Sequence, residues 1–360
     1  MLALKDWIKS CSHPLVIAGP CSAETEEQVL QTAQGLSGNE HIKIFRAGVW
    51  KPRTRPSAFE GAGEQALGWL QKVKEQTGLM PATEIANVKH LELALKYGID
   101  IIWLGARTTT NPFSVQEIAE GLKGKDIAVL VKNPVMPDLQ LWLGAIERIN
   151  NAGIKKIIAV HRGFNSLQRG RYRNSPEWRL VIELKRLHPE LPVICDPSHI
   201  SGTRLYLAEV AQMAMDLGLA GLMVEAHIDP ANALSDKRQQ LTPSSLLALL
   251  KGLKTRNEYS GSPSFDKILL ELRTKIDLLD EQLLQFMSQR MQLVREIAGY
   301  KDKNDVTILQ IKRWDEIIKN RLAKADELNL NKDFIQLWYN LIHEESIIVQ
   351  TEIMNKNKNK

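Results

Sequence analysis

Cysteine is scarce in this 360-residue chain, which has only three. Three cysteines cannot form a closed disulfide framework, so we do not expect disulfides to hold the fold together. Long apolar runs are also missing. The N-terminal stretch is broken by Lys5, Asp6 and Lys9, which excludes a signal-peptide core, and no run approaches the length of a membrane span. These absences predict a cytoplasmic protein without a membrane partner.

A large excess of either charge is missing too. The formal net charge is +5, and the sequence has no long basic run outside its NKNKNK end. Such a balance argues against a nucleic-acid partner and favours small anionic ligands. The hydrophobic content of 44% is ordinary for a globular protein, and the length suffices for one large core or two moderate ones. We expect disorder only over residues 355–360.

The first two thirds of the chain repeat one structural unit. Short apolar runs, typical of buried parallel strands, alternate with segments of helical periodicity that tend to end in glycine. The runs cover residues 16–18, 42–45, 80–83, 99–104, 128–131, 156–160, 193–195 and 221–224. Eight such units predict a closed (β/α)8 TIM barrel over residues 1–252. An open doubly wound sheet is the weaker alternative.

Four potential metal ligands lie where an apolar run gives way to polar residues. They are Cys21, His199, Glu225 and Asp236. Each one alone has an ordinary structural explanation, but the recurrence of the same strand-end context favours a shared role. A thiolate, an imidazole and two carboxylates that converge would form a mixed-ligand site for one divalent ion. This set of donors suits manganese, iron, cobalt or zinc.

Cationic side chains follow several of the same strands. Active sites of barrels of this kind lie at the carboxyl ends of the strands, where the sequence places Arg46, Lys51, Arg107, Lys132 and Arg162. An unpaired charge is costly to bury, so each cation needs an anionic partner. Salt bridges to Glu24, Glu60 or Glu84 would supply partners one by one. Five cations at one mouth favour a ligand that carries phosphate and carboxylate groups.

A family resemblance covers about residues 1–252. FRAGVWKPRTRPSAFEG, together with AGPCS, GARTTTNPF, LVKNP, HRGF, CDPSHISG, VEAH and ALSDKRQQL, resembles 3-deoxy-D-arabino-heptulosonate 7-phosphate (DAHP) synthase, the entry enzyme of the shikimate pathway. The resemblance implies condensation of phosphoenolpyruvate with erythrose 4-phosphate and release of phosphate. It also implies one divalent metal ion, for which manganese is the first expectation, bound by Cys21, His199, Glu225 and Asp236.

The same resemblance implies roles for the cations. Phosphoenolpyruvate would be held by Arg46, Lys51, Ala106, Arg107, Lys132 and Arg162. The sugar phosphate would be held by Arg53 and Thr54, with Asp196 near its hydroxyls. We expect Lys51, Lys132 and His199 to take part in catalysis. The related 3-deoxy-manno-octulosonate 8-phosphate synthases use arabinose 5-phosphate, but KPRT at 51–54 favours the four-carbon sugar.

Two positions depart from the family pattern. His161 stands before Arg162 where an acidic residue is more usual, and Arg55 follows KPRT where serine is common. Either change would affect water placement or the contacts to the sugar phosphate. Neither touches the expected metal ligands.

After Leu253 the pattern changes. A polar stretch over 253–263 is typical of a linker, and helical periodicity without strands follows at about 264–303, 309–325 and 332–354. These segments predict a separate all-α three-helix domain over 264–354. The first helix would extend about 60 Å, which is long for one small domain, so we expect it to pack against a partner.

This region is similar to the all-helical chorismate mutases, which convert chorismate to prephenate. By position, the site would comprise Arg273, Arg290, Lys301, Arg313, Ser346 and Gln350. The cations would bind the two carboxylates, and Lys301 and Gln350 would donate to the ether oxygen, where charge develops as the bond breaks. We therefore name Arg290, Lys301 and Gln350 as catalytic. No cofactor is expected here.

Helix geometry adds an expectation about assembly. Arg273 and Arg290 are seventeen positions apart on one helix, about 25 Å, so they cannot bind the same small ligand from one chain. The resemblance therefore implies an intertwined homodimer.

Two departures weaken the catalytic expectation for this domain. Trp314 stands where the family has glutamate, and Gln310 replaces an aspartate. We expect real but modest mutase activity. The alternative is a helical module that dimerises and binds chorismate or prephenate as a sensor without turnover. In either case, we expect prephenate or chorismate in this domain to regulate the synthase, which requires different affinities for two states.

Overall fold

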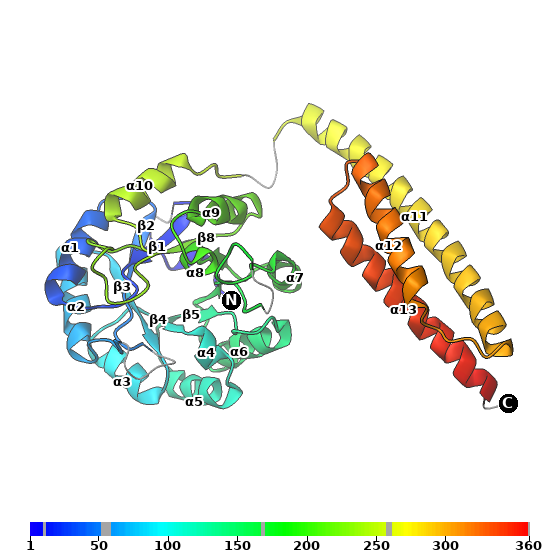
Figure 1. Cartoon of the computed structure of the whole chain (residues 1–360). Coiled ribbons are helices and arrows are strands. Elements are labelled where there is room, and N and C mark those ends of the chain that lie inside the picture. The colour runs from blue at the N-terminus through cyan, green and yellow to red at the C-terminus, as the bar shows by residue number, and fades with distance from the viewer. Residues whose placement is uncertain (10–11, 52–58, 167–169, 257–260, 359–360) are drawn as a thin grey trace. The chain divides into compact units, whose positions relative to one another are not determined.

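The chain forms two compact units, Met1–Glu258 and Tyr259–Lys360 (Figure 1). The structure is a computed structural model and describes all residues except 10–11, 52–58, 167–169, 257–260 and 359–360. Within the described residues, no helix has the length and apolar character needed to cross a bilayer.

The first unit is a closed barrel of eight parallel strands, in sequence order around the ring. The strands are β1 (Leu15–Gly19), β2 (Ile42–Arg46), β3 (Met80–Ile85), β4 (Ile101–Leu104), β5 (Ala128–Lys132), β6 (Ile157–His161), β7 (Val193–Cys195) and β8 (Gly221–Glu225). Pairing of β1 with β8 closes the ring, which confirms the predicted barrel and excludes the open sheet. Each strand lies within two residues of its predicted bounds.

Helices surround this barrel (Figure 1). They are α1 (Glu26–Leu36), α2 (Gln65–Thr77), α3 (Val88–Lys96), α5 (Pro112–Leu122), α6 (Leu139–Asn151), α7 (Trp178–Leu187), α9 (Leu207–Asp216) and α10 (Pro243–Gly252). Two short helices, α4 (Ala106–Thr109) and α8 (Pro197–Ser201), directly follow β4 and β7. Because they begin at the carboxyl ends of strands, they hold Arg107 and His199 at the mouth of the barrel.

Alternation along the strands creates two apolar cores. Ile17, Ile44, Trp103 and Leu130 belong to the core inside the barrel, whereas their neighbours pack between strands and helices. Ile8, which follows the 3-10 helix η1 (Leu4–Asp6), packs into the inner core. Gly221 permits the closing contact of the ring, since a Cβ there would lie 2.0 Å from the carbonyl oxygen of Leu15.

The second unit consists of α11 (Pro263–Lys303), α12 (Ile311–Glu327) and α13 (Lys332–Lys358). The predicted three-helix region is confirmed, and the 41 residues of α11 extend about 60 Å. Helix α13 continues to Lys358, beyond the end expected near 354, and the expected disorder of the tail stays a prediction.

Candidate active sites of the two units

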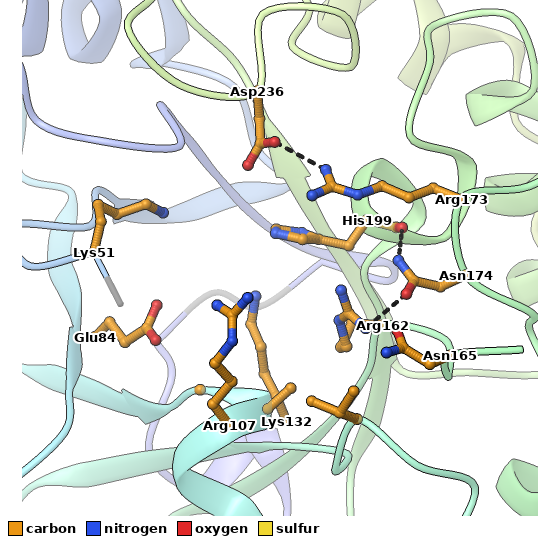
Figure 2. A pocket seen from close by; sticks show the side chains of 13 residues that line it. Lys51, Glu84, Arg107, Lys132, Arg162, Asn165, Arg173, Asn174, His199 and Asp236 are labelled. Atoms are coloured by element: carbon orange, nitrogen blue, oxygen red, sulfur yellow. Dashed lines mark hydrogen bonds and ion pairs between the residues drawn. The ribbon is translucent and has the colours of Figure 1, made fainter. Parts of the chain in front are cut away.

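A cavity of about 420 Å3 lies at the carboxyl ends of the barrel strands (Figure 2). Predicted residues that line it are Lys51, Ala106, Arg107, Lys132, Arg162, His199 and Asp236. Lys132 ends β5 and the others lie in segments that follow β2, β4, β6, β7 and β8, so the barrel gathers residues that are far apart in the sequence. In Figure 2 the side chains of Arg107, Lys132 and Arg162 point toward the same space as those of His199 and Asp236.

Three of the four predicted metal ligands, Cys21, Glu225 and Asp236, lie together beside this cavity, and His199 approaches Glu225. Atoms of Cys21, Glu225 and Asp236 that can bind a metal all lie within 4.8 Å of one another. The thiol Sγ is 3.2 Å from Oδ2 of Asp236, and Nε2 of His199 is 3.7 Å from Oε1 of Glu225. Asp236 reaches the group from a left-handed backbone conformation, with φ of 46°.

The chemistry of these donors fits a divalent cation. Burial raises the pKa of Cys21 to about 12, and the negative charge of Glu225 adds to the rise, so the thiol keeps its proton near neutral pH. A bound cation would favour the thiolate and offset the clustered carboxylates. Burial also lowers the pKa of His199, which keeps the imidazole in the neutral form that binds metals.

Buried ion pairs lie beneath the cavity. Nη1 of Arg46 is 3.3 Å from Oε1 of Glu225, and its Nη2 donates to the carbonyl oxygen of Cys21 at 3.1 Å. Nζ of Lys132 is 2.9 Å from Oδ2 of Asp196, whose Oδ2 is also 2.8 Å from Nδ1 of His199. Arg46 and Asp196 therefore support the cavity from below, while Lys132 reaches its surface.

The ring of Trp103 forms a platform under these cations. Its centroid lies 4.9 Å from the guanidinium carbon of Arg46 and 5.7 Å from Nζ of Lys132. The indole Nε1 donates to Glu84 at 3.1 Å. Because Trp103 is fully buried, it holds both cations in place by cation–π attraction without access to water.

The guanidinium of Arg162 is buried and lies near other charged groups. Burial lowers its pKa to about 10, and the nearby charges of Arg173 and Arg107 add to the decrease, while Asp196 opposes it. Its Nη1 donates to Oδ1 of Asn174 at 3.0 Å. A guanidinium destabilised in this way would be stabilised by an anionic ligand in the cavity.

Lys51 lies at the edge of the cavity that is opposite Asn174 (Figure 2). Its Nζ donates to the carbonyl oxygen of Cys21 at 2.9 Å. Arg53, Thr54 and Arg55 lie outside the described residues. Their predicted contacts to a sugar phosphate therefore stay predictions.

Sequence reasoning missed several residues that line this cavity, and Glu84, Arg173 and Asn174 are the ones that bear on the site. Glu84 lies near the end of β3, so the strand-end rule that found the other residues could have found it. Arg173 donates to Oδ1 of Asp236 at 2.8 Å, and Asn174 donates to the carbonyl oxygen of His199 at 2.6 Å. These two residues orient the expected ligands, but nothing in their local sequence indicates that contact.

His161 does not face the cavity. Its ring lies 4.9 Å from that of Trp178 and 5.9 Å from that of Phe164, on the outer side of β6. Burial lowers its pKa to about 3, so it stays neutral. Any effect of this departure on water placement would therefore be indirect, because inward and outward side chains alternate along a strand and Val160 takes the inward position.

The second unit brings together four of its six predicted site residues. Arg290 donates to Oγ of Ser346 at 2.8 Å, and Gln350 follows Ser346 by one turn on α13. Lys301 donates to the carbonyl oxygen of Ile308 at 2.6 Å. Burial lowers the pKa of both Arg290 and Lys301, as expected for cations that face a partly dry site.

Arg273 and Arg313 lie apart from this group within the chain. Arg273 is exposed and seventeen residues from Arg290 on α11, and Arg313 is exposed and paired with Glu316 at 3.1 Å. Trp314, which stands where the family has glutamate, packs against α13. Its ring stacks on that of His343 with centroids 3.9 Å apart.

The contact of Arg173 with Asp236 leads to a prediction about metal affinity. Replacing Arg173 with Met removes the hydrogen bond that orients the carboxylate, and we expect the affinity for Mn2+ to fall about tenfold. Loss of orientation outweighs the removal of a positive charge, because this side chain is 49% exposed and its charge is screened. Titration of the metal-free protein against a competing chelator measures the affinity.

Arg171→Met is the matched control for that titration. Arg171 is a nearby arginine of the same segment, but its guanidinium pairs with Glu209 instead. Its replacement should leave the affinity unchanged. Equal affinities for all three proteins would show that Arg173 does not support the site.

Comparisons with known proteins agree with this geometry. Residues 7–260 match the model of the DAHP synthetase I family, and residues 272–351 match that of chorismate mutase type II. The chain is 34% identical over 239 residues to a phospho-2-dehydro-3-deoxyheptonate aldolase of Thermotoga maritima, covering 66% of this chain and 68% of that protein.

A further relative and a solved structure match about two thirds of this chain. A 2-dehydro-3-deoxyphosphooctonate aldolase of Syntrophotalea carbinolica is 29% identical over 264 residues, which cover 67% of this chain and 90% of that protein. The crystal structure of the DAHP synthase of Thermotoga maritima has a TM-score of 0.60 at 33% identity, and covers 66% of this chain and 67% of that one. The chain therefore belongs to the DAHP synthetase I family, and it joins this synthase domain to a chorismate mutase type II domain, a combination that supports a bifunctional role in the shikimate pathway.

Proposed function

We propose that the barrel condenses phosphoenolpyruvate with erythrose 4-phosphate, with one divalent ion held by Cys21, His199, Glu225 and Asp236. The observation that carries this proposal is the thiol and carboxylate cluster beside a cavity lined by cations. The family is generally metal-dependent. Manganese is our first expectation for the ion, and iron, cobalt or zinc would suit the same donors.

The residues of the cavity match the needs of this reaction. A divalent ion bound there supplies Lewis-acid polarisation of the aldehyde of the sugar phosphate. Arg107, Lys132 and Arg162 neutralise the charge of phosphoenolpyruvate and fix the face of its double bond, with Lys51 and the backbone of Ala106 at the rim. Arg46 acts from beneath, where it holds Glu225, and Asp196 holds His199 and Lys132.

Phosphate release tests the synthase proposal. With phosphoenolpyruvate and erythrose 4-phosphate, we expect turnover that a chelator abolishes and Mn2+ restores. Cys21→Ala should lower the rate by more than about a hundredfold, because it removes a ligand. Arabinose 5-phosphate, the matched alternative sugar, should react poorly.

Cys195→Ala is the control variant. Cys195 is also a fully buried thiol, but it packs in the outer core between strands and helices. It should retain the wild-type rate. Undiminished turnover by the chelated enzyme would falsify the role of the metal.

We further propose that the helical unit converts chorismate to prephenate. Arg290 and Lys301 would bind carboxylate and ether oxygens, and Gln350 would donate to the ether oxygen as the bond breaks. Ser346 positions Arg290 through the 2.8 Å hydrogen bond. Arg313 would join the site if its surface pair with Glu316 opens, which costs little because both side chains are exposed.

A second copy of the chain would complete this site. Apolar side chains form a stripe along α11 at helical spacing, and all are at least 47% exposed: Leu272, Ile276, Leu279, Leu283, Phe286, Leu293 and Ile297. Exposure of so long an apolar stripe to water is energetically unfavourable. Packing two copies of α11 against each other would bury it, and would bring Arg273 of one chain to Arg290 of the other. We propose this homodimer.

Mixed dimers test this arrangement. Arg273→Ala and Arg290→Ala should each lower chorismate turnover strongly. In a dimer formed from one chain of each kind, one site has both arginines intact. Co-production of the two variants should therefore restore about a quarter of the wild-type activity, because half of the dimers are mixed and each has one intact site. Arg273→Ala produced alone is the control, and no recovery in proven mixed dimers would exclude a shared site.

We also propose that prephenate or chorismate, bound in the helical unit, regulates the synthase. Coupling of two sites requires that the effector bind two states of the enzyme with different affinities. We expect saturating prephenate to change the rate of phosphate release by at least about fivefold. An unchanged rate in the full chain would exclude this form of regulation.

The sensor without catalysis stays as the second candidate for the helical unit. Trp314 in place of glutamate and the exposed position of Arg313 favour it. Calorimetric binding of prephenate without any loss of chorismate would support the sensor. Measurable chorismate turnover would exclude it.

A further inference from the structure

His343 lies beside the expected chorismate site, although no resemblance pointed to it. It precedes Ser346 by three positions and Gln350 by seven on α13, so all three lie along one face of the helix. The imidazole stacks on the indole of Trp314, with ring centroids 3.9 Å apart and an angle of 12° between the planes. The stack holds the half-buried imidazole in a defined orientation.

Two polar atoms on this face are buried without a partner. Nε2 of His343 and Oε1 of Gln350 are closed to solvent and make no hydrogen bond to any residue that the structure describes. Gln350 is only 8% exposed. Buried polar atoms in folded proteins nearly always have a partner, so two unsatisfied ones on one face of α13 indicate that a ligand supplies it.

The charges around His343 decide which ligand group it suits. Burial lowers the pKa of His343, and the positive charges of Arg290 and Lys301 add to the decrease, so the ring is neutral near pH 7. Chorismate offers two carboxylates, an ether oxygen and a ring hydroxyl. The carboxylates suit the two cations, whereas a neutral imidazole, which can donate or accept at Nε2, suits the one neutral hydroxyl group.

We propose that Nε2 of His343 forms a hydrogen bond with the ring hydroxyl of bound chorismate, and that Trp314 positions the imidazole for this contact. The proposal rests on the mutase function of the helical unit. It also gives the departure at position 314 a role. An aromatic ring at that position serves as the support for a polar group that comes from α13.

The full-length protein and two substrates test this contact. His343→Phe retains a ring that can stack on Trp314 but deletes Nε2. We expect it to lower kcat/KM for chorismate about tenfold. With an analogue in which hydrogen replaces the ring hydroxyl, the variant and the wild type should have equal kcat/KM values, because the contact is absent in both.

Two further variants distinguish the contact from a packing effect. His343→Gln keeps a polar group at this place and should recover part of the lost kcat/KM for chorismate. His90→Phe is the matched control, because His90 stacks on Trp50 in the barrel with the same centroid distance of 3.9 Å. Its mutase constants should equal those of the wild type.

The outcomes separate this proposal from the function on which it rests. If the wild type does not turn over chorismate, the mutase proposal itself fails. If the wild type is active but His343→Phe loses nothing, or loses equally on both substrates, the hydroxyl contact is wrong and the mutase proposal stands. A loss on chorismate alone, with partial recovery in His343→Gln, supports it.

Discussion

Buried charges of opposite sign at the carboxyl end of the barrel are the constraint on which the synthase site depends. Arg46 with Glu225 and Lys132 with Asp196 are almost entirely shielded from water. Removing either member of such a pair leaves an uncompensated charge, which is far more costly than the pair is stabilising. The pairs therefore fix where Glu225 and His199 stand, because Asp196 holds the imidazole and Arg46 holds the carboxylate.

Alternation along the strands makes this layer possible. Inward residues of the lower barrel are apolar, as Ile17, Ile44 and Leu130 show, whereas the last inward positions of several strands are charged. Trp103 lies at the boundary, with one face toward the apolar core and cations over its ring. The apolar core thus ends directly beneath a polar cavity. The low dielectric constant of this core strengthens the electrostatic attraction between the cavity and anions.

The helical unit is subject to the opposite constraint, an apolar surface that its own three helices leave uncovered. Helix α13 supplies the hydroxyl that contacts Arg290, while much of α11 remains exposed. A mutase site that needs Arg273 from another copy would couple catalysis to assembly. The same unit would then serve as an enzyme, a dimerisation surface and a binding site for an effector.

The sequence alone determined the barrel, its strands and the strand-end residues, because periodicity and turn residues are local and each strand end leads to the same face of the ring. It also determined the long helix and the change of character after Leu253. Tertiary structure decided what these local rules do not contain. Arg173 and Asn174 reach ligands in other loops, His161 turns outward, and Arg46 lies under the cavity instead of in it. Contacts between distant segments depend on how the loops pack, and this information is absent from any single stretch of sequence. His343 shows the same limit, because its importance appears only once α12 places Trp314 against it.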